Sequence, residues 1–463
     1  MYINNWINSE FFDAPLADTR LENRLKILTN SFYNKPGSHL PEACGSYAAT
    51  AAAYRFFANE RINPEVILMG HRDSTINRMK KHETVLAIQD TTDFDYRSHP
   101  ATKNLGTHST SETALGFLNH TTLAVSESGV PLGILSSEIW TRDPKEYGKS
   151  RDRAKLPTKD KESNKWLKAL DSSLKDTPKY TKVVTVCDRE ADIYDFFAKA
   201  ITDGKHLLVR VQHKDRKLGD GAKLLEKIKS QPVAGTIITS VPRDIENKRK
   251  PRDVSLNIKY CPVSIMAPKN RTGGYLLPKL DLYLVLAQEA TPIEGEEPIS
   301  WLLITTIPVE SLEQAVEKIR WYKQRWKIER YHHVLKSGCK VEELQLEEAD
   351  HLKNALAVYS VVAWKLLWVK LESEENPEAS CDVVLQEHEW QALCCVTEKK
   401  SIPPEQPPTL EEAVLMIAKI GGFLGRNCDG KPGTQVIWRG LRRLHDIALG
   451  WQVARLPTNP KIV

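Results

Sequence analysis

The chain has 463 residues, of which 41% are hydrophobic and 27% are charged, a composition typical of a soluble globular protein. Its length is too great for one ordinary core, which excludes a single small domain and predicts two or three domains. The 65 lysine and arginine residues against 60 acidic residues give a net charge of +5, which permits a nucleic-acid partner without establishing one.

Cysteine usage and apolar runs indicate where the protein works. The eight cysteines are scattered and form no C-x-x-C pair, which argues against a zinc knuckle and favours a reducing compartment. The N-terminus lacks a basic region followed by an apolar one, so no signal peptide is predicted. The most apolar stretch, 356–369, is interrupted by Lys365 and is too short to span a bilayer. We therefore expect a cytoplasmic protein without a membrane partner.

Residues 1–65 predict a compact helical module. Arg20 and Arg24 lie one helical turn apart, and a Gly-Ser break at 45–46 precedes a run of helix-forming residues that contains Arg55. The module carries 6 basic against 7 acidic residues, so charge alone does not predict that it binds DNA. A helical cap on a larger domain is the alternative.

The middle of the chain predicts an α/β core in which two carboxylates follow buried strands. The run TVLAIQD ends at Asp90, and TKVVTVC is followed directly by Asp188. The whole region gives the order three strands, helix, strand, helix, strand. This is the order of a ribonuclease-H-like fold, in which an antiparallel meander pairs with parallel strands. The remaining elements are expected as strands at 117–126, 131–141 and 206–211 and helices at 162–175 and 192–201.

The stretch 212–305 predicts a β-rich insertion in this core. Alternating apolar segments such as LDLYLVLAQEA indicate its strands, and WLLIT, which begins at Trp301, forms the last of them. Residues 205–259 hold 14 lysine and arginine residues against 6 acidic residues, with a basic tract from Lys248 to Arg252. The tract fits contacts to phosphates, although a basic hairpin loop is more often simply solvated.

The stretch 311–338 predicts one long helix. Ser311 followed by Gln314 is a capping-box start, and Gly338 is a suitable stop. A phenol, a guanidinium, a carboxylate and an ammonium lie within about 60° of one another around this helix. We call this set the polar stripe, and its members are Tyr322, Arg325, Glu329 and Lys336.

The end of the chain is predicted to be helical. A second apolar helix is expected at about 352–369, and a proline-rich spacer at 401–408 leads to helices at 410–420 and 435–449. The apolar faces of these last two helices fit either a dimerisation surface or packing against their own chain.

Three carboxylates are candidates for a metal site. In an open sheet, functional groups collect at the carboxyl ends of strands, so we expect Asp90 and Asp188 at one edge and Glu329 on a helix that packs across it. Three carboxylates suit Mg²⁺ or Mn²⁺, and two such ions about 3.5–4 Å apart stabilise the attacking and leaving oxygens of a phosphoryl transfer. The alternatives are an aspartate that only caps the following helix and a charged helix face that is only solvated.

The motifs together resemble those of a known family. The motif Y-x-x-R-x-x-x-E-x-x-x-x-x-x-K at 322–336 is similar to the signature of the insertion-sequence-four family of bacterial DDE transposases. The segments DREAD at 188–192 and DTT at 90–92 resemble the surroundings of that family's two aspartates. The likeness extends over nearly the whole chain, including YRF at 54–56 and GGF at 421–423.

This resemblance implies a cut-and-paste transposase with a ribonuclease-H-like core. Asp90, Asp188 and Glu329 would bind two catalytic ions per active site, Mg²⁺ or Mn²⁺ in its place. Water nicks the DNA to free a 3′-hydroxyl, which attacks the opposite strand and forms a hairpin. Water reopens the hairpin, and the 3′-hydroxyl then joins target DNA. All steps are phosphoryl transfers at one site, so no nucleotide cofactor is expected.

The resemblance also implies roles in DNA binding. The three cationic or phenolic members of the polar stripe would hold phosphates near the cut. Trp301 would stack on a base that leaves the duplex, a contact worth about 1–3 kcal/mol, although a tryptophan that opens a strand is most often a core or rim residue. The expected DNA contacts are Tyr322, Arg325, Lys336, Trp301, Arg210, Lys248, Arg249, Lys250, Arg252, Arg20, Arg24 and Arg55.

The expected partners are double-stranded DNA with the element's inverted ends, target DNA and a second copy of the chain in a synaptic homodimer. The expected domains are a helical end-binding domain at 1–65, a catalytic domain at 66–375 with the insertion at 212–305, and a helical dimerisation domain at 376–463. One departure from the family is Arg20-Leu21, where a relative has adjacent arginines.

Two other functions compete with this one. A DNA-binding regulator of transposition that does not cut is disfavoured, because the chain keeps all three carboxylates and the N-terminal module. A DNA nuclease that does not transpose cannot be separated from a transposase by sequence.

Overall fold

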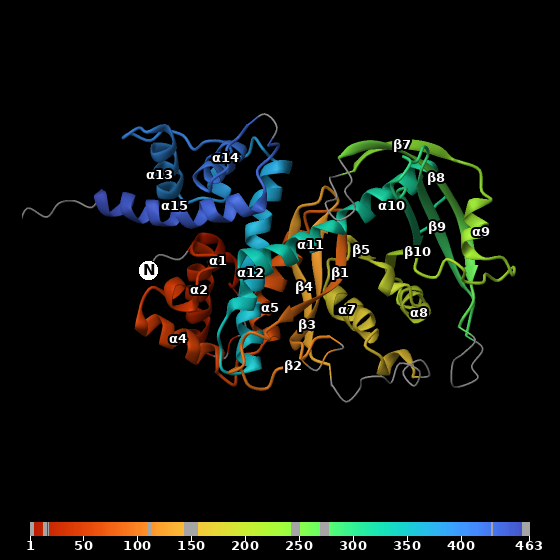
Figure 1. Cartoon of the computed structure of the whole chain (residues 1–463), viewed down its shortest axis with the longest axis horizontal. Helices are drawn as coiled ribbons and strands as arrows, with labels where there is room; N and C mark the ends of the chain where they lie inside the picture. Colours follow the sequence, from red (N-terminus) through yellow and green to blue (C-terminus); the bar gives the residue numbers. More distant parts are fainter. Residues whose placement is uncertain are drawn as a thin grey trace, which may run out of the picture.

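A ten-stranded sheet lies at the centre of the molecule (Figure 1). The structure is a computed structural model that describes residues 4–12, 16, 18–109, 111, 113–142, 156–241, 251–268, 277–426 and 429–455. The strands follow the order β2-β3-β1-β5-β6-β10-β9-β8-β7, and β4 also pairs with β3. Alternate residues of β1 belong to two different apolar clusters, Leu86 and Ile88 to one and Val85 and Ala87 to the other. Both faces of the sheet are therefore covered.

One half of the sheet has the ribonuclease-H-like order that the sequence predicts. Strand β1 is antiparallel to β3 and parallel to β5, and β5 is parallel to β6. Two helices, α7 and α8, lie in the connections to the parallel strands. The bounds are β1 (Thr84–Asp95), β2 (Gly106–Thr107), β3 (Leu115–Ser126), β4 (Pro131–Trp140), η2 (Thr158–Asp160), α7 (Asn164–Leu174), β5 (Lys182–Cys187), η3 (Arg189–Ala191), α8 (Tyr194–Thr202) and β6 (His206–Arg210).

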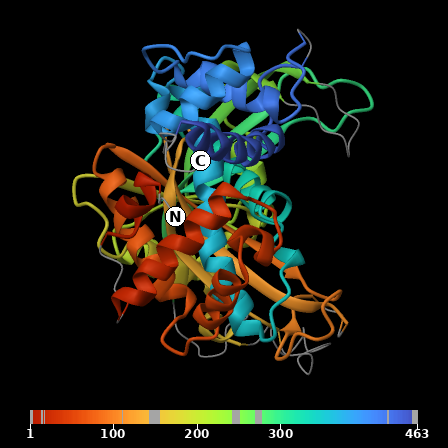
Figure 2. The same ribbon diagram turned by 90° about the vertical axis from the view of Figure 1, so that its left-hand side faces the viewer.

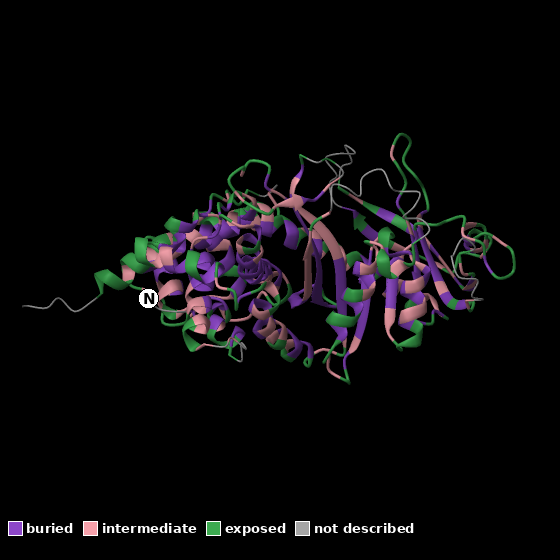
Figure 3. Ribbon diagram, turned by 90° about the horizontal axis from the view of Figure 1, so that it is seen from below, coloured by how far each residue is buried: buried purple, intermediate pink, exposed green. Residues whose placement is uncertain are grey.

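The strands of the insertion continue this same sheet. The last of them, β10, pairs with β6 on one side and β9 on the other, both antiparallel. Figure 3 shows buried residues along the strands and many exposed residues in the loops and helices around them. The insertion thus shares a hydrogen-bonded frame with the core. Its elements are α9 (Leu224–Lys229), β7 (Gly235–Val241), β8 (Arg252–Ile265), β9 (Leu280–Glu289) and β10 (Ser300–Thr305).

The helix predicted at 311–338 is divided, so the prediction of one continuous helix is wrong. It consists of α10 (Leu312–Gln324), α11 (Trp326–His333) and a π-helical turn, η4 (Val334–Gly338). The predicted start is confirmed, since the Ser311 hydroxyl accepts a hydrogen bond from Gln314 N at 3.3 Å. Arg325 is the junction between the first two segments.

The terminal helices pack together around one long helix, α12 (Figure 2). A single apolar cluster contains Leu28 and Phe57 from the N-terminal helices, Val358 from α12 and Ile417 and Leu441 from the C-terminal helices. The three regions expected as domains therefore share one core. The helices are α1 (Asn5–Glu10), α2 (Thr19–Asn34), α3 (Leu40–Cys44), α4 (Tyr47–Phe57), α5 (Pro64–Met79), η5 (Val341–Glu343), α12 (Ala349–Glu375), η6 (Cys381–Val383), α13 (Glu387–Glu398), α14 (Leu410–Ile420) and α15 (Thr434–Ala454).

Helix α12 is long and apolar enough to cross a membrane, but 89% of its most apolar window is buried inside the protein. Its buried Asn354 side chain donates hydrogen bonds to Phe57 O at 2.9 Å and Ile62 O at 3.3 Å. Trp364 Nε1 donates to Pro131 O at 2.9 Å. These contacts make α12 a core helix that joins the N-terminal helices to the sheet.

A buried charged cluster fixes α1 to α5. Glu10 Oε1 lies 2.5 Å from His71 Nδ1, and both Glu10 oxygens accept hydrogen bonds from Arg78 at 2.8 and 2.9 Å. His71 Nε2 accepts from Ile134 N, so its ring is neutral with the proton on Nδ1. Burial opposes ionisation of Glu10, but His71 and Arg78 outweigh it and lower the pKa of Glu10 to about 2.

This cluster predicts a loss of stability in acid. The pKa of Glu10 in the folded state lies below its usual value of 4.5, so its contribution is complete above pH 4.5 and is lost as the pH falls towards 2. We expect Glu10→Gln to lower the free energy of unfolding at pH 7 by about 3 kcal/mol. Urea unfolding at pH 7 and pH 3.5 measures this. If the free energy of unfolding of Glu10→Gln falls as much between pH 7 and pH 3.5 as that of the natural chain, the prediction is contradicted.

Candidate active site

Two aspartates lie side by side where the parallel pairing of the sheet ends. The last rung between β1 and β5 joins Ile88 to Val186, and Asp90 and Asp188 each lie two residues beyond it. The prediction that Asp90 ends its strand is wrong, because β1 continues to Asp95 through antiparallel pairing with β3. The consequence for the site is small, since Asp90 still lies beyond the end of β5.

The glutamate of the polar stripe reaches the same place from α11. Its neighbour one turn earlier, Arg325, stands between the carboxylates, with its Nη1 at 3.7 Å from Asp90 Oδ2 and its Nη2 in a close ion pair with Glu329 Oε1. The side chains of Arg325, Asp90 and Glu329 are 14%, 17% and 32% exposed. Helix α11 packs along β1, which fixes this approach.

The charges at this point act on one another. Burial raises the pKa of Asp90 to about 7, and repulsion from Asp188 and Glu329 adds to the rise, while Arg325 and the Thr91 amide oppose it. Burial also raises the pKa of Glu329, with a further rise from Asp188 and an opposing effect of Arg325. Burial likewise raises the pKa of Asp188. The three carboxylates are therefore close enough to disfavour one another's ionisation, which is the setting in which a cation is bound.

Asp188 also caps the turn that follows it. Its Oδ1 accepts a hydrogen bond from Glu190 N at 2.9 Å, so the capping role that the sequence left open is present. A carboxylate has two oxygens and about four lone-pair sites. Capping thus leaves Asp188 able to bind a cation as well.

The three carboxylates fit a hard divalent cation in kind, because carboxylate oxygens are the ligands that Mg²⁺ and Mn²⁺ prefer. As placed, they do not yet form a site. No three histidine, cysteine, aspartate or glutamate side chains within the described ranges are grouped to hold a metal ion. The guanidinium of Arg325 lies between Asp90 and Glu329 instead.

Tyr322 extends the site towards the insertion. Its buried side chain is hydrogen-bonded to that of Arg210, and burial raises the pKa of the phenol, as does the nearby Asp188. Arg210 is the last residue of β6 and donates to Ser300 O at 3.3 Å. Trp301 follows on β10, half-buried. The structure therefore brings Tyr322 and Arg210 together, and Trp301 is the next residue after the Ser300 that Arg210 contacts.

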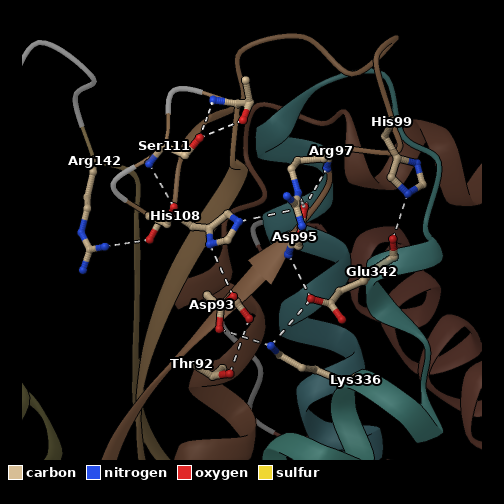
Figure 4. A network of polar contacts seen from close by, with 12 residues as sticks. Thr92, Asp93, Asp95, Arg97, His99, His108, Ser111, Arg142, Lys336 and Glu342 are labelled. Atoms are coloured by element: carbon tan, nitrogen blue, oxygen red, sulfur yellow. Dashed lines mark hydrogen bonds and ion pairs between the residues drawn. The ribbon is translucent and has the colours of Figure 1, made fainter. Parts of the chain in front are cut away.

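Lys336 lies apart from the three carboxylates. Its Nζ is 3.4 Å from Asp93 Oδ1 and 3.7 Å from Glu342 Oε1, in a network that includes His108 (Figure 4). Asp93 is three residues beyond Asp90 on β1. The far end of the polar stripe therefore faces a later part of the same strand, after the π-helical turn has shifted its register.

Comparison with known proteins decides the family. Residues 3–62 match the transposase DNA-binding model, residues 154–364 the transposase DDE domain, and residues 361–459 the Tn5 transposase dimerisation domain. The chain belongs to the DDE transposases. The matches confirm the resemblance found in the motifs and relate this transposase to that of Tn5. Asp188 and Glu329 lie inside the DDE match, and Asp90 precedes it.

Family membership gives the activity of this transposase. It is an enzyme that cleaves DNA and transfers strands, and it depends on a divalent metal. DNA and a second copy of the chain are its partners. It is a soluble protein of the cytoplasm, where it acts on DNA. A cryo-EM structure of the piggyBac transposase synaptic complex with hairpin DNA is similar at a TM-score of 0.36 and 7% identity, over 99% of this chain and 79% of that one.

The other expected DNA contacts of the transposase are spread over two regions. On the N-terminal helices, Arg20 and Arg55 are exposed and Arg24 is half-buried. In the insertion, Arg252 forms ion pairs with Glu289 and with Glu296, the latter at 3.2 Å. The tract Lys248, Arg249 and Lys250 lies outside the described residues.

Sequence reasoning missed Lys165 of the transposase. Its Nζ lies 3.3 Å from Glu190 Oε2, and its charge counteracts the rise in the pKa of Asp188 that burial causes. It comes from α7, whose sequence NKWLKALDSSL reads as an ordinary amphipathic helix. No motif in that helix signals a residue beside the site.

Proposed function

We propose that this transposase excises and inserts DNA by a cut-and-paste route through a hairpin, with Asp90, Asp188 and Glu329 as the residues that hold its catalytic metal. The observation that supports this is the convergence of the three carboxylates, from two strands and one helix, at the edge of the sheet where parallel pairing ends. We propose two Mg²⁺ ions per site, replaceable by Mn²⁺.

When bound, the metal supplies a lowered pKa for attacking water and neutralises charge on the leaving oxygen. The chain's own residues place the DNA. Tyr322, Arg325 and Arg210 offer hydrogen-bond donors to phosphates beside the carboxylates. In each transfer, an oxygen of water or of a 3′-hydroxyl bonds to phosphorus as the bond to the leaving 3′-oxygen breaks, so no covalent protein intermediate is required.

The proposed division of labour follows the order of the chain. Residues 1–65 bind the element's inverted end through Arg20, Arg24 and Arg55. Residues 66–375 carry the chemistry, and the insertion at 212–305 adds contacts from Arg252 and the 248–250 tract. Residues 376–463 pair two subunits so that each cuts the end held by its partner and joins it to target DNA. The host is bacterial.

The experiment that tests the proposal uses the purified full chain, Mg²⁺ and a duplex that carries the inverted end flanking its own gene. The expected products are a nicked strand, then a hairpin, then a blunt end, resolved on denaturing gels. Nicks at unrelated sites without a hairpin would point to a nuclease that does not transpose. Binding without cleavage would point to a regulator.

Within the same assay, Trp301→Ala is expected to nick normally but to accumulate little hairpin. The sharp bend of a hairpin expels a base from the stack, and loss of a stacking partner worth about 1–3 kcal/mol lowers hairpin yield about 5- to 150-fold. Trp301→Phe keeps an aromatic face and restores most of the yield. Normal hairpin formation by the alanine variant would remove Trp301 from this role.

A further inference from the structure

The family requires a divalent metal, but the carboxylates expected to bind it are not arranged as a metal site in this structure. The described residues hold no ready group of three metal ligands, although three carboxylates meet at one edge of the sheet. The group that separates two of them is a single side chain, the Arg325 guanidinium. This side chain carries its own positive charge into the place where a metal is expected.

The guanidinium is a direct competitor for the carboxylate oxygens. It contacts Asp90 Oδ2 with one terminal nitrogen and Glu329 Oε1 with the other. The contact with Glu329 is a charge-assisted hydrogen bond, and the contact with Asp90, at 3.7 Å, is a longer ion pair. A divalent ion must displace both contacts to reach the same oxygens, and it must also approach a fixed positive charge. Both effects weaken metal binding while Arg325 stays in place.

The backbone around Arg325 suits a side chain that moves. It lies at the junction of α10 and α11, where Arg325 N bonds to Tyr322 O at 3.0 Å and Ile328 N bonds to Arg325 O at 3.2 Å. These bonds span three residues instead of four, and such a stretch inside a helix often marks a hinge. The side chain is also partly open to solvent, so a phosphate can approach it.

A second cation on the same helical stretch is held in the same way. Lys336 is paired with Asp93 and Glu342 (Figure 4). Thus both cations of the polar stripe are held by carboxylates in the absence of DNA. A phosphate is an alternative partner for either cation, because arginine and lysine form charge-assisted hydrogen bonds with phosphate as they do with carboxylate.

We propose that Arg325 is a resident cation that keeps divalent metal out of this site until a DNA phosphate draws its guanidinium away. Metal uptake is thereby coupled to binding of the DNA end. The inference rests on the proposed role of Asp90, Asp188 and Glu329 as metal ligands. It assigns to Arg325 a function in the DNA-free protein in addition to holding a phosphate in the complex.

The test measures Mn²⁺ binding to the full chain without DNA, by the electron paramagnetic resonance signal of free Mn²⁺. We expect Arg325→Gln to bind Mn²⁺ about tenfold tighter or more than the natural chain, because one charge-assisted interaction is removed from the competition. Arg330→Gln is the matched control: it removes the same charge from an exposed position of α11 and leaves the affinity unchanged. Arg325→Lys, which keeps the charge but cannot bridge both carboxylates, is expected to lie between, and it carries the test if the glutamine variant fails to fold.

Adding the duplex with the element's end is expected to raise the Mn²⁺ affinity of the natural chain more than that of Arg325→Gln. Equal affinity of the natural chain and both Arg325 variants without DNA would overturn the inference and leave the proposed function intact. Tight binding by Arg325→Gln that survives Glu329→Gln would place the metal elsewhere, which also overturns it. Failure of every form to bind Mn²⁺ even with DNA would instead overturn the proposed metal site itself.

Discussion

Replacing Asp188 by asparagine will abolish DNA cleavage and leave binding to the element's end intact. Asparagine has the same shape and keeps a side-chain oxygen for the bond from Glu190 N, so the turn after β5 is preserved. It removes the negative charge that a divalent ion needs. The metal contributes several kcal/mol to stabilising the transition state. Its loss is expected to lower the cleavage rate by a factor of about a thousand or more.

Gel-based cleavage rates and a mobility-shift assay on the same duplex measure the two properties separately. Asp171→Asn is the control, because it removes the same charge from an exposed residue of α7 that is paired only with Lys199 in the described part of the chain. Its cleavage rate is expected to equal that of the natural chain. If Asp188→Asn still cuts within tenfold of the natural rate, Asp188 is not a metal ligand.

The paired double substitution Leu449→Glu and Val453→Glu is expected to abolish the two-ended complex while single-end binding persists. These residues are one turn apart near the end of α15 and are 47% and 67% exposed. Burying two such side chains contributes about 1.5–3 kcal/mol each, so their loss weakens pairing of subunits about a hundredfold or more. Cleavage falls with it, since each subunit is proposed to cut the end held by its partner.

Substitution is a sharper test than truncation here. Trp438, Leu441 and Leu444 of α15 are buried within the protein, so removal of residues after 376 would expose core surface of α12 and confuse unfolding with loss of pairing. Sedimentation of the protein with end DNA reports the assembly directly. The control is Val396→Glu with Ile402→Glu, two other exposed apolar residues of the C-terminal region. If the control pair breaks the complex and the α15 pair does not, the dimer surface lies around the end of α13.

The core of the fold was predictable from sequence because its signals are local. Buried strands appear as short apolar runs, and the order of strands and helices is enough to give the ribonuclease-H-like arrangement. Asp188 falls where expected because its strand ends at Cys187. The continuation of β1 past Asp90 was not predictable, because it depends on pairing with β3, and pairing register is invisible in a single run of residues.

The details of the site depended on contacts between distant residues. The junction at Arg325 contains no glycine or proline, so nothing in the sequence predicted a break in the helix. Lys336 fits a helical period with Glu329, yet the π-helical turn brings it to Asp93 and Glu342. The sequence did not predict helix α13, because its apolar residues occur only in short runs between charged residues. The family resemblance predicted that Arg325 and Lys336 bind phosphates, but not that carboxylates of the same chain are their partners in this structure.

The single apolar cluster that joins both termini to α12 limits how this enzyme can be rebuilt. The segment that carries Phe57 and Ile62 is tied to Asn354 by buried hydrogen bonds, and the last helices pack on the other part of α12. Neither terminal region can therefore be exchanged for that of a relative without changing its contacts with α12. A chimera that takes the first 65 residues from a relative, to recognise another element's end, must also take the facing side chains of α12, or the hybrid loses stability.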